Sequence, residues 1–203
     1  MLVNGDGDKG EADRPGDASA LAGPTSSAGA SSPSQKPTTG TATDPEALAQ
    51  ARALHTLIDH SAADKHRIAV AASQLQTCRH LKQGIHAFED AAASRDQLVD
   101  EASGLQVGLL PGGGAAIASF SKALRASADA DRAYVAYGQK RHKVPAGKRR
   151  HHRQPMKCTG GKKLLQQAVR LSSASHAAKQ RTAKEWNLIA TQFKLPKVVW
   201  TSL

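Results

Sequence analysis

Four segments of the chain carry apolar residues at a helical spacing, and glycine or proline separates them. The segments span about residues 45–82, 84–105, 114–138 and 160–194. Within each one the apolar residues recur about every 3.5–3.6 residues, which is the period of an α-helix. Short connections between the first three segments favour antiparallel neighbours. We therefore predict an all-α, up-down-up-down four-helix bundle. Aromatic residues make up only 3% of the chain, which leaves little material for a core between β-sheets.

The N-terminal part has a different composition. Residues 1–44 are mostly Gly, Ala, Ser, Thr, Pro and Asp, with few large apolar side chains. Such a segment buries too little surface to offset the entropy of ordering its backbone, so we predict a disordered, low-complexity leader. Asp44 is a suitable helix cap and Pro45 a suitable first helical residue. The bundle domain is therefore expected to cover residues 45–200.

Three further signals concern the ends of helices, two in the first helix and one in the last. Ser61 and Asp64 resemble a capping pair, which predicts a kink or a restart near His60. Gly84 is expected to end this helix. Thr159 is the expected cap of the last helix.

The positive charge of the chain is concentrated in its last third. The net charge is +11, yet Glu185 is the single acidic residue after position 140. The connection over residues 139–159 is predicted to be a basic loop, and it contains no aromatic residue for stacking on bases. An anionic partner is expected to meet this region through phosphates. The candidate anion-binding residues are Lys140, Arg141, Lys143, Lys148, Arg149, Arg150, Arg153, Lys162 and Lys163.

The last helix should pack on the first one near the start of the domain. Trp186 is expected to fill the core there, and Asn187 to hydrogen-bond nearby backbone. Phe193 lies on the same stripe, and Pro196 is expected to stop the helix. The predicted contacts join Leu48, Leu54 and Leu57 to Trp186, Ile189 and Phe193, with Leu109 and Leu110 beneath them.

The two cysteines are candidates for a disulfide. In the predicted topology the first helix ends at the same end of the bundle where the last one begins, so Cys78 and Cys158 become neighbours. Two unlinked thiols remain the alternative. A zinc site that adds His80, His151 and His152 is a further alternative, although its spacing is unlike that of structural zinc motifs.

Two polar residues lie on otherwise apolar stripes. Asp131 interrupts the stripe of the third helix, and Arg95 occupies the corresponding position of the second. We expect them to form an ion pair that sets the register of the two helices. His176 lies near several serines, but no acidic residue follows it closely in sequence, so no catalytic arrangement is predicted.

The C-terminal pattern resembles a known type of domain. Its elements are the segment from Ala183 through Trp186-Asn187 to Ala190, followed by Leu195-Pro196. The segment from Ser127 to Tyr134 and the cysteine positions add to the likeness. Over roughly residues 45–200 the chain is similar to a helical domain of actinobacterial proteins that often follows a membrane anchor or a signal sequence. No activity is established for that family, so the resemblance implies a fold and a compartment only. The chain differs by its more basic loop and by lacking an anchor.

The sequence points to an interaction protein. No motif identifies catalytic residues, a metal site or a cofactor. The leading hypothesis is a non-enzymatic interaction or scaffold module with an unknown protein partner. The alternative is sequence-nonspecific binding of nucleic acid or another polyanion through the basic loop. No transmembrane segment or signal peptide is evident, which predicts a cytoplasmic protein. If an upstream start is missing, the protein is expected to be extracytoplasmic or membrane-anchored.

Overall fold

The computed structural model describes residues 44–63, 65–145 and 156–203. The predicted leader, apart from Asp44, and the loop residues 146–155 lie outside this part of the chain. The elements are α1 (Pro45–Ala62), α2 (Lys65–Thr77), α3 (Leu81–Gly104), α4 (Gly113–Gln139), β1 (His142–Pro145), β2 (Met156–Thr159), α5 (Lys162–Phe193) and the short 3-10 helix η1 (Trp200–Ser202).

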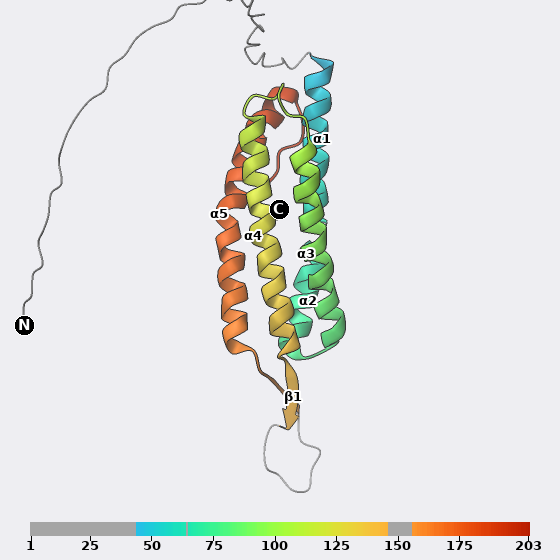
Figure 1. Ribbon diagram of the computed structural model, residues 1–203, viewed down its shortest axis with the longest axis vertical. Helices are drawn as coiled ribbons and strands as arrows, with labels where there is room; N and C mark the ends of the chain where they lie inside the picture. The colour runs from blue at the N-terminus through green and yellow to red at the C-terminus, as the bar shows by residue number, and fades with distance from the viewer. Residues whose placement is uncertain (1–43, 64, 146–155) are drawn as a thin grey trace, which may run out of the picture. The chain divides into compact units, whose positions relative to one another are not determined.

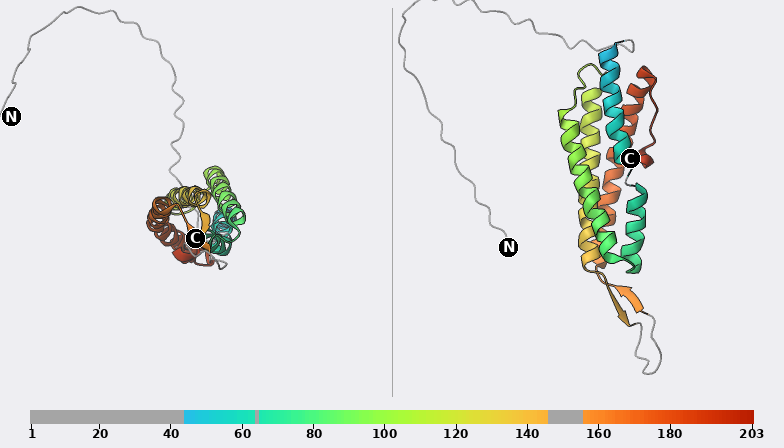
Figure 2. Two further views of the ribbon diagram at one scale, coloured as in Figure 1. Left: turned by 90° about the horizontal axis from the view of Figure 1, so that it is seen from below. Right: turned by 90° about the vertical axis from the view of Figure 1, so that its right-hand side faces the viewer.

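The helices form the predicted all-α, up-down-up-down four-helix bundle. α1 and α2 follow one another along one edge and together take the place of the first helix (Figure 1). α3, α4 and α5 then run in alternating directions (Figure 2). α4 packs against both α3 and α5, and α1 contacts α3 and α5. No helix in the described part of the chain is both long and apolar enough to cross a membrane.

The start of the first helix agrees with the sequence analysis, and its interruption agrees in part. Asp44 Oδ1 accepts hydrogen bonds from the backbone N–H of Glu46 at 2.9 Å and of Ala47 at 3.4 Å. The expected restart is found between Ala62 and Lys65. Ser61 does not begin the next helix, however. Its hydroxyl donates to the carbonyl of Ile58 within α1, at 2.7 Å, so the expected cap at this residue is wrong.

The first helical segment ends earlier in the sequence than predicted. α2 ends at Thr77, and Cys78 and His80 adopt left-handed backbone conformations, with φ of 51° and 53°. Gly84 instead lies inside α3. A Cβ atom there would be 3.0 Å from Leu75 Cδ2 and 3.2 Å from the carbonyl oxygen of Ala71. Gly84 is therefore needed for the close approach of α2 and α3, and not for a turn.

Leu75 of α2 fits between two glycines of neighbouring helices. It is fully buried. A Cβ atom on Gly138 of α4 would be 2.9 Å from Leu75 Cδ2 and 2.7 Å from Ile85 Cγ1. Such distances are too short for carbon atoms, so both glycines allow the helices to pack closely at this end of the bundle.

The buried apolar residues form two separate clusters along the bundle. The larger cluster lies at the end where α1 begins, and it contains Leu54, Leu57, Trp186, Ile189 and Phe193. Leu110 belongs to it, and Leu48 and Leu109 pack against it. The predicted contacts between the first and last helices are thus confirmed. The smaller cluster lies at the other end and is built around Leu75, Phe88 and Tyr137.

The segment after α5 folds back along the helix. α5 ends at Phe193, and Lys194 reverses the chain with φ of 54°. Trp186 Nε1 then donates to the carbonyl of Pro196 at 3.0 Å. Asn187 donates to the carbonyl of Val198 and accepts from its N–H, both at 2.9 Å. The predicted hydrogen bonding of Asn187 to nearby backbone is confirmed, and residues 196–203 become part of the bundle wall.

The connection between α4 and α5 contains a β-hairpin that the sequence analysis missed. β1 and β2 are antiparallel, and His142 pairs with Thr159 and Lys143 with Cys158. Thr159 therefore ends a strand, and Gly161, with φ of 74°, precedes the helix in place of the expected cap. Figure 1 shows β1 extending beyond the end of the helices.

A disulfide joins the base of this hairpin to the end of α2. Cys78 and Cys158 are bonded, and their Cα atoms are 5.6 Å apart although 80 positions separate them in sequence. This pairing agrees with the prediction from the bundle topology. It also removes both thiolates that the zinc alternative requires.

Replacing Gly138 by Ala is expected to destabilise the protein by about 1–3 kcal/mol, because the new methyl group overpacks the contact with Ile85 and Leu75. Gly114→Ala is the matched control, since no atom lies within 4 Å of its Cβ position. This control should be neutral or stabilising by up to about 1 kcal/mol, because Ala is the better helix former. Urea unfolding followed by circular dichroism measures both effects. Equal stabilities of the two variants would contradict the close packing at Gly138.

The double variant Cys78→Ser, Cys158→Ser is expected to lose about 3–4.5 kcal/mol of stability, because the disulfide closes a long loop. Urea unfolding with and without reductant measures the loss. In parallel, cellular thiols are alkylated before lysis and the intact mass is recorded. No cysteine should be modified without reductant, and two after reduction. Two modified cysteines before reduction would contradict the disulfide.

Candidate functional site

The described members of the predicted anion-binding set lie around the hairpin. Lys140 and Lys143 are exposed at the end of α4 and on β1, and Lys162 and Lys163 are exposed in the first turn of α5. The structure adds Lys157, which is exposed on β2. The sequence analysis did not select it, although its position within the basic loop was a usable signal. Lys148, Arg149, Arg150 and Arg153 lie outside the described residues.

Arg141 has a different role from its lysine neighbours. Its guanidinium donates to the carbonyl oxygens of Leu75 at 3.1 Å, Gln76 at 2.6 Å and Gly160 at 3.0 Å. It also lies over the ring of Tyr137, with 5.2 Å to the ring centroid. Carbonyl groups at the end of a helix lack partners within that helix. Arg141 therefore caps α2 and attaches the base of the hairpin to the bundle, and three of its five N–H donors bind main-chain oxygens.

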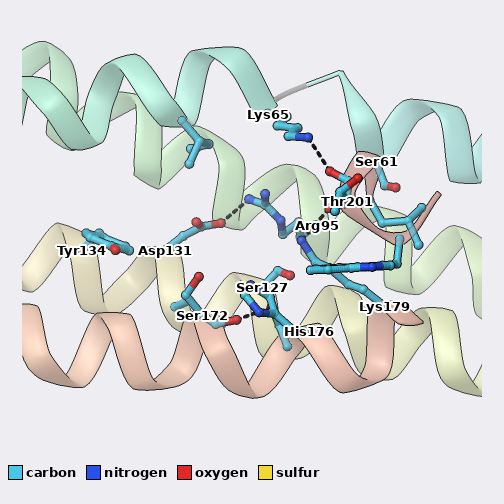
Figure 3. A pocket seen from close by; sticks show the side chains of 15 residues that line it. Ser61, Lys65, Arg95, Ser127, Asp131, Tyr134, Ser172, His176, Lys179 and Thr201 are labelled. Atoms are coloured by element: carbon cyan, nitrogen blue, oxygen red, sulfur yellow. Dashed lines mark hydrogen bonds and ion pairs between the residues drawn. The ribbon is translucent and has the colours of Figure 1, made fainter. Parts of the chain in front are cut away.

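A cavity of about 380 Å³ with polar and apolar lining residues lies between the two apolar clusters. Figure 3 shows side chains from the break between α1 and α2, from α3, α4 and α5, and from η1 around it. The sequence analysis did not identify this cavity. The lining residues are Ser61, Lys65, Ile68, Arg95, Ser127, Ala130, Asp131, Tyr134, Ser172, Ser175, His176, Lys179, Trp200, Thr201 and Leu203.

Arg95 and Asp131 form the predicted ion pair at the wall of this cavity. Arg95 Nη1 contacts Asp131 Oδ2, as Figure 3 shows. The two side chains are only 12% and 6% exposed. A carboxylate or guanidinium buried to this degree is stable in its charged form only with a partner. The pair therefore joins α3 to α4 at one register.

Two lysines bind the back-folded segment across the cavity. Lys65 Nζ donates to the carbonyl oxygen of Thr201, and Lys179 Nζ donates to the main-chain oxygen of Leu203 at 2.6 Å. The pKa of Lys179 is lowered to about 8, first because burial disfavours its charged form and then because the cation of Arg95 is near. Lys65 lowers this pKa further, and Asp131 opposes the shift.

Ser127 and His176 are two further polar residues that line the cavity. Ser127 is 6% exposed, and its hydroxyl oxygen has no hydrogen-bond partner in the described part of the chain. His176 lies against Trp200, with ring centroids 5.2 Å apart. The spacing of Ser172, His176 and Lys179 was a usable signal, since residues three and four apart share one face of a helix.

The polar side chains around the cavity offer ion pairing and hydrogen bonding. Among the described residues, no group of three or more His, Cys, Asp or Glu side chains is arranged to hold a metal ion. The polar side chains that line the cavity carry ammonium, guanidinium, hydroxyl and imidazole groups. The carboxylate among the side chains of its described lining residues is that of Asp131.

Comparisons with known proteins return no relative. No family model matches the chain, and no curated protein or solved structure shows significant similarity to it. The resemblance to the actinobacterial helical domain therefore stays a prediction from its residues.

Asp131→Ala is expected to destabilise the protein by about 3–5 kcal/mol, because it leaves Arg95 buried without its partner. The double variant Arg95→Met, Asp131→Leu should regain most of this loss, since well-packed apolar residues replace buried ion pairs at little cost. Thermal and urea unfolding of the three proteins measure the difference. A double variant no more stable than Asp131→Ala would contradict this account of the pair.

Proposed function

We propose that the chain is a non-enzymatic helical interaction module that binds a phosphate-bearing polyanion, such as nucleic acid, without regard to sequence. The observation that supports this most directly is a set of exposed lysines on and beside a hairpin attached to the bundle. The set consists of Lys140, Lys143, Lys157, Lys162 and Lys163.

The charge around the hairpin favours a polyanion. Residues 140–163 contain no Asp or Glu. Within the described ranges, none of the five lysines forms an ion pair. Lysines without acidic neighbours attract the phosphates of a nucleic acid. When they neutralise these phosphates, the counterions of the nucleic acid are released, and this release is the main driving force of sequence-independent binding.

The attachment of the hairpin also favours binding. The disulfide from Cys78 to Cys158 joins β2 to the end of α2, and Arg141, next to β1, donates two hydrogen bonds to carbonyl oxygens of α2. A surface held in place before binding loses less entropy when a partner docks. The lysines can therefore act together as one surface.

The disulfide supports the extracytoplasmic alternative for the compartment. Structural disulfides form and persist mainly in oxidising surroundings, and cytosolic thiols are kept reduced. The alkylation of thiols before lysis, described above, tests this assignment together with the bond.

The binding test uses the whole chain and a short fluorescein-labelled DNA duplex, with anisotropy measured from about 50 to about 200 mM salt. Replacing Lys143, Lys157, Lys162 and Lys163 by Gln should weaken binding. It should also flatten the slope of log affinity against log salt by up to ~3.6, or about 0.9 for each lost phosphate contact. The same change at Lys148, Arg149, Arg150 and Arg153 should reduce affinity in the same manner.

A charge-matched control distinguishes binding by the lysines around the hairpin from a general effect of the protein's net charge. Arg52, Lys122, Arg125 and Lys184 are exposed on α1, α4 and α5, away from the hairpin. Replacing these four by Gln removes the same charge and should change the affinity far less. Equal losses in the control and the hairpin variants, or no binding of the unmodified chain to DNA, would refute the proposal.

A further inference from the structure

We propose that the hairpin of β1 and β2 binds in the major groove of B-form duplex DNA, with one face toward each of the two phosphate backbones. This inference rests on the proposed binding of a polyanion and names the form of nucleic acid that the hairpin fits. Three observations support it: lysines on both faces of the hairpin, surrounding segments without acidic residues, and the thickness of a two-stranded ribbon.

The register of the two strands places lysines on opposite faces of the hairpin. Lys143 pairs with Cys158. Lys157 pairs with Val144. Directly opposed residues of an antiparallel pair share one face, and consecutive residues of a strand alternate between faces. Lys143 and Cys158 therefore lie on one face, and Lys157 lies on the other. The side chains of both lysines are exposed.

The face of Lys143 has a second cation near its base. Cys158 lies on this face and is bonded to Cys78 at the end of α2. Arg79 follows Cys78 directly in the chain and is exposed. The sequence analysis did not select this arginine. One face of the hairpin thus has Lys143 and Arg79 available for phosphates, and the other face has Lys157.

The segments around the hairpin lack acidic residues. Residues 65–88 and 132–184 include neither Asp nor Glu. They contain α2, the start of α3, the end of α4 and the hairpin, which meet at one end of the bundle (Figure 1). No carboxylate from these segments repels an approaching phosphate backbone, so both faces of the hairpin are electrostatically suited to DNA.

A two-stranded ribbon matches the width of the major groove. Packed β-sheets lie about 10 Å apart, which is the thickness of one sheet with its side chains. The major groove of B-DNA is about 12 Å wide and admits such a ribbon, whereas the minor groove is only about 6 Å wide. The strands extend past the ends of the helices (Figure 2). A ribbon that enters the groove by one edge turns one face to each phosphate backbone.

Lysines on both faces favour duplex DNA over other nucleic acids. The two backbones of a duplex border a groove on both sides, whereas a single strand has one row of phosphates. Residues 139–159 contain no Phe, Tyr or Trp on which unpaired bases could stack. Duplex RNA has a deep, narrow major groove that side chains cannot read. B-form DNA is therefore the partner that fits the hairpin.

The experiment measures the binding of the whole chain to three fluorescein-labelled nucleic acids of one sequence and length: duplex DNA, duplex RNA and single-stranded DNA. Duplex RNA is the matched control, because it has as many phosphates as the duplex DNA but a different groove. We expect duplex DNA to bind at least about tenfold more tightly than either of the others at about 100 mM salt. Equal affinities for the two duplexes would overturn this inference and leave the proposed polyanion binding intact. No binding to any of the three would refute both.

Single variants test whether both faces contact DNA at the same time. Lys143→Gln and Lys157→Gln should each flatten the slope of log affinity against log salt by about 0.9, and the double variant by about 1.8. Lys122→Gln, at an exposed position of α4 away from the hairpin, is the control and should leave the slope unchanged. Circular dichroism and urea unfolding establish that each variant is folded. A slope that depends on only one of the two hairpin lysines would mean that DNA lies against a single face, and would overturn the inference.

Modified DNA identifies the groove. The C5 position of a pyrimidine faces the major groove. Duplex DNA whose cytosines carry glucosylated 5-hydroxymethyl groups therefore has the same charge as ordinary DNA but an obstructed major groove. The affinity of the chain for this DNA should fall at least about tenfold. An unchanged affinity would place the hairpin outside the major groove and contradict the proposal.

Discussion

The ion pair between Arg95 and Asp131 organises the middle of the bundle. It lies between two apolar clusters, one around Trp186 and one around Leu75. Apolar packing alone permits several registers of neighbouring helices at similar energy, because the side chains involved are small and alike. A buried charge pair does not permit this, since a shifted register leaves both charges unpaired. The pair therefore selects one alignment of α3 and α4.

Other parts of the chain meet close to this ion pair. The first helix is interrupted between Ala62 and Lys65 at the same level, and the back-folded segment lies next to this interruption. Lys65 and Lys179 both donate to this segment. The segment is in turn held by Trp186 and Asn187 of α5. The cavity is thus lined by elements distant in sequence, and the residues that set the register are part of its polar lining.

The lysines at the hairpin and those at the cavity are in different surroundings. The hairpin lysines are exposed, and water and salt screen their charge, so the proposed binding of a polyanion would rely on many contacts. At the cavity, Lys65 and Lys179 donate to main-chain oxygens of the back-folded segment. These two lysines therefore contribute to the fold itself.

The sequence by itself determined the helices, the Asp44 cap, the antiparallel order, and the pairing of Asp131 with Arg95 and of Cys78 with Cys158. These features follow from periodicity, from local backbone chemistry and from the short connections. The function and the compartment are still proposals. Only the tertiary structure decided that Gly84 serves close packing, that Arg141 caps α2, and that residues 142–159 contain paired strands. It also decided where the segment after Phe193 returns, and so created the cavity. The reason is physical: helical periodicity is a property of neighbouring residues, whereas a cavity depends on the relative register of several helices, to which every long-range contact contributes.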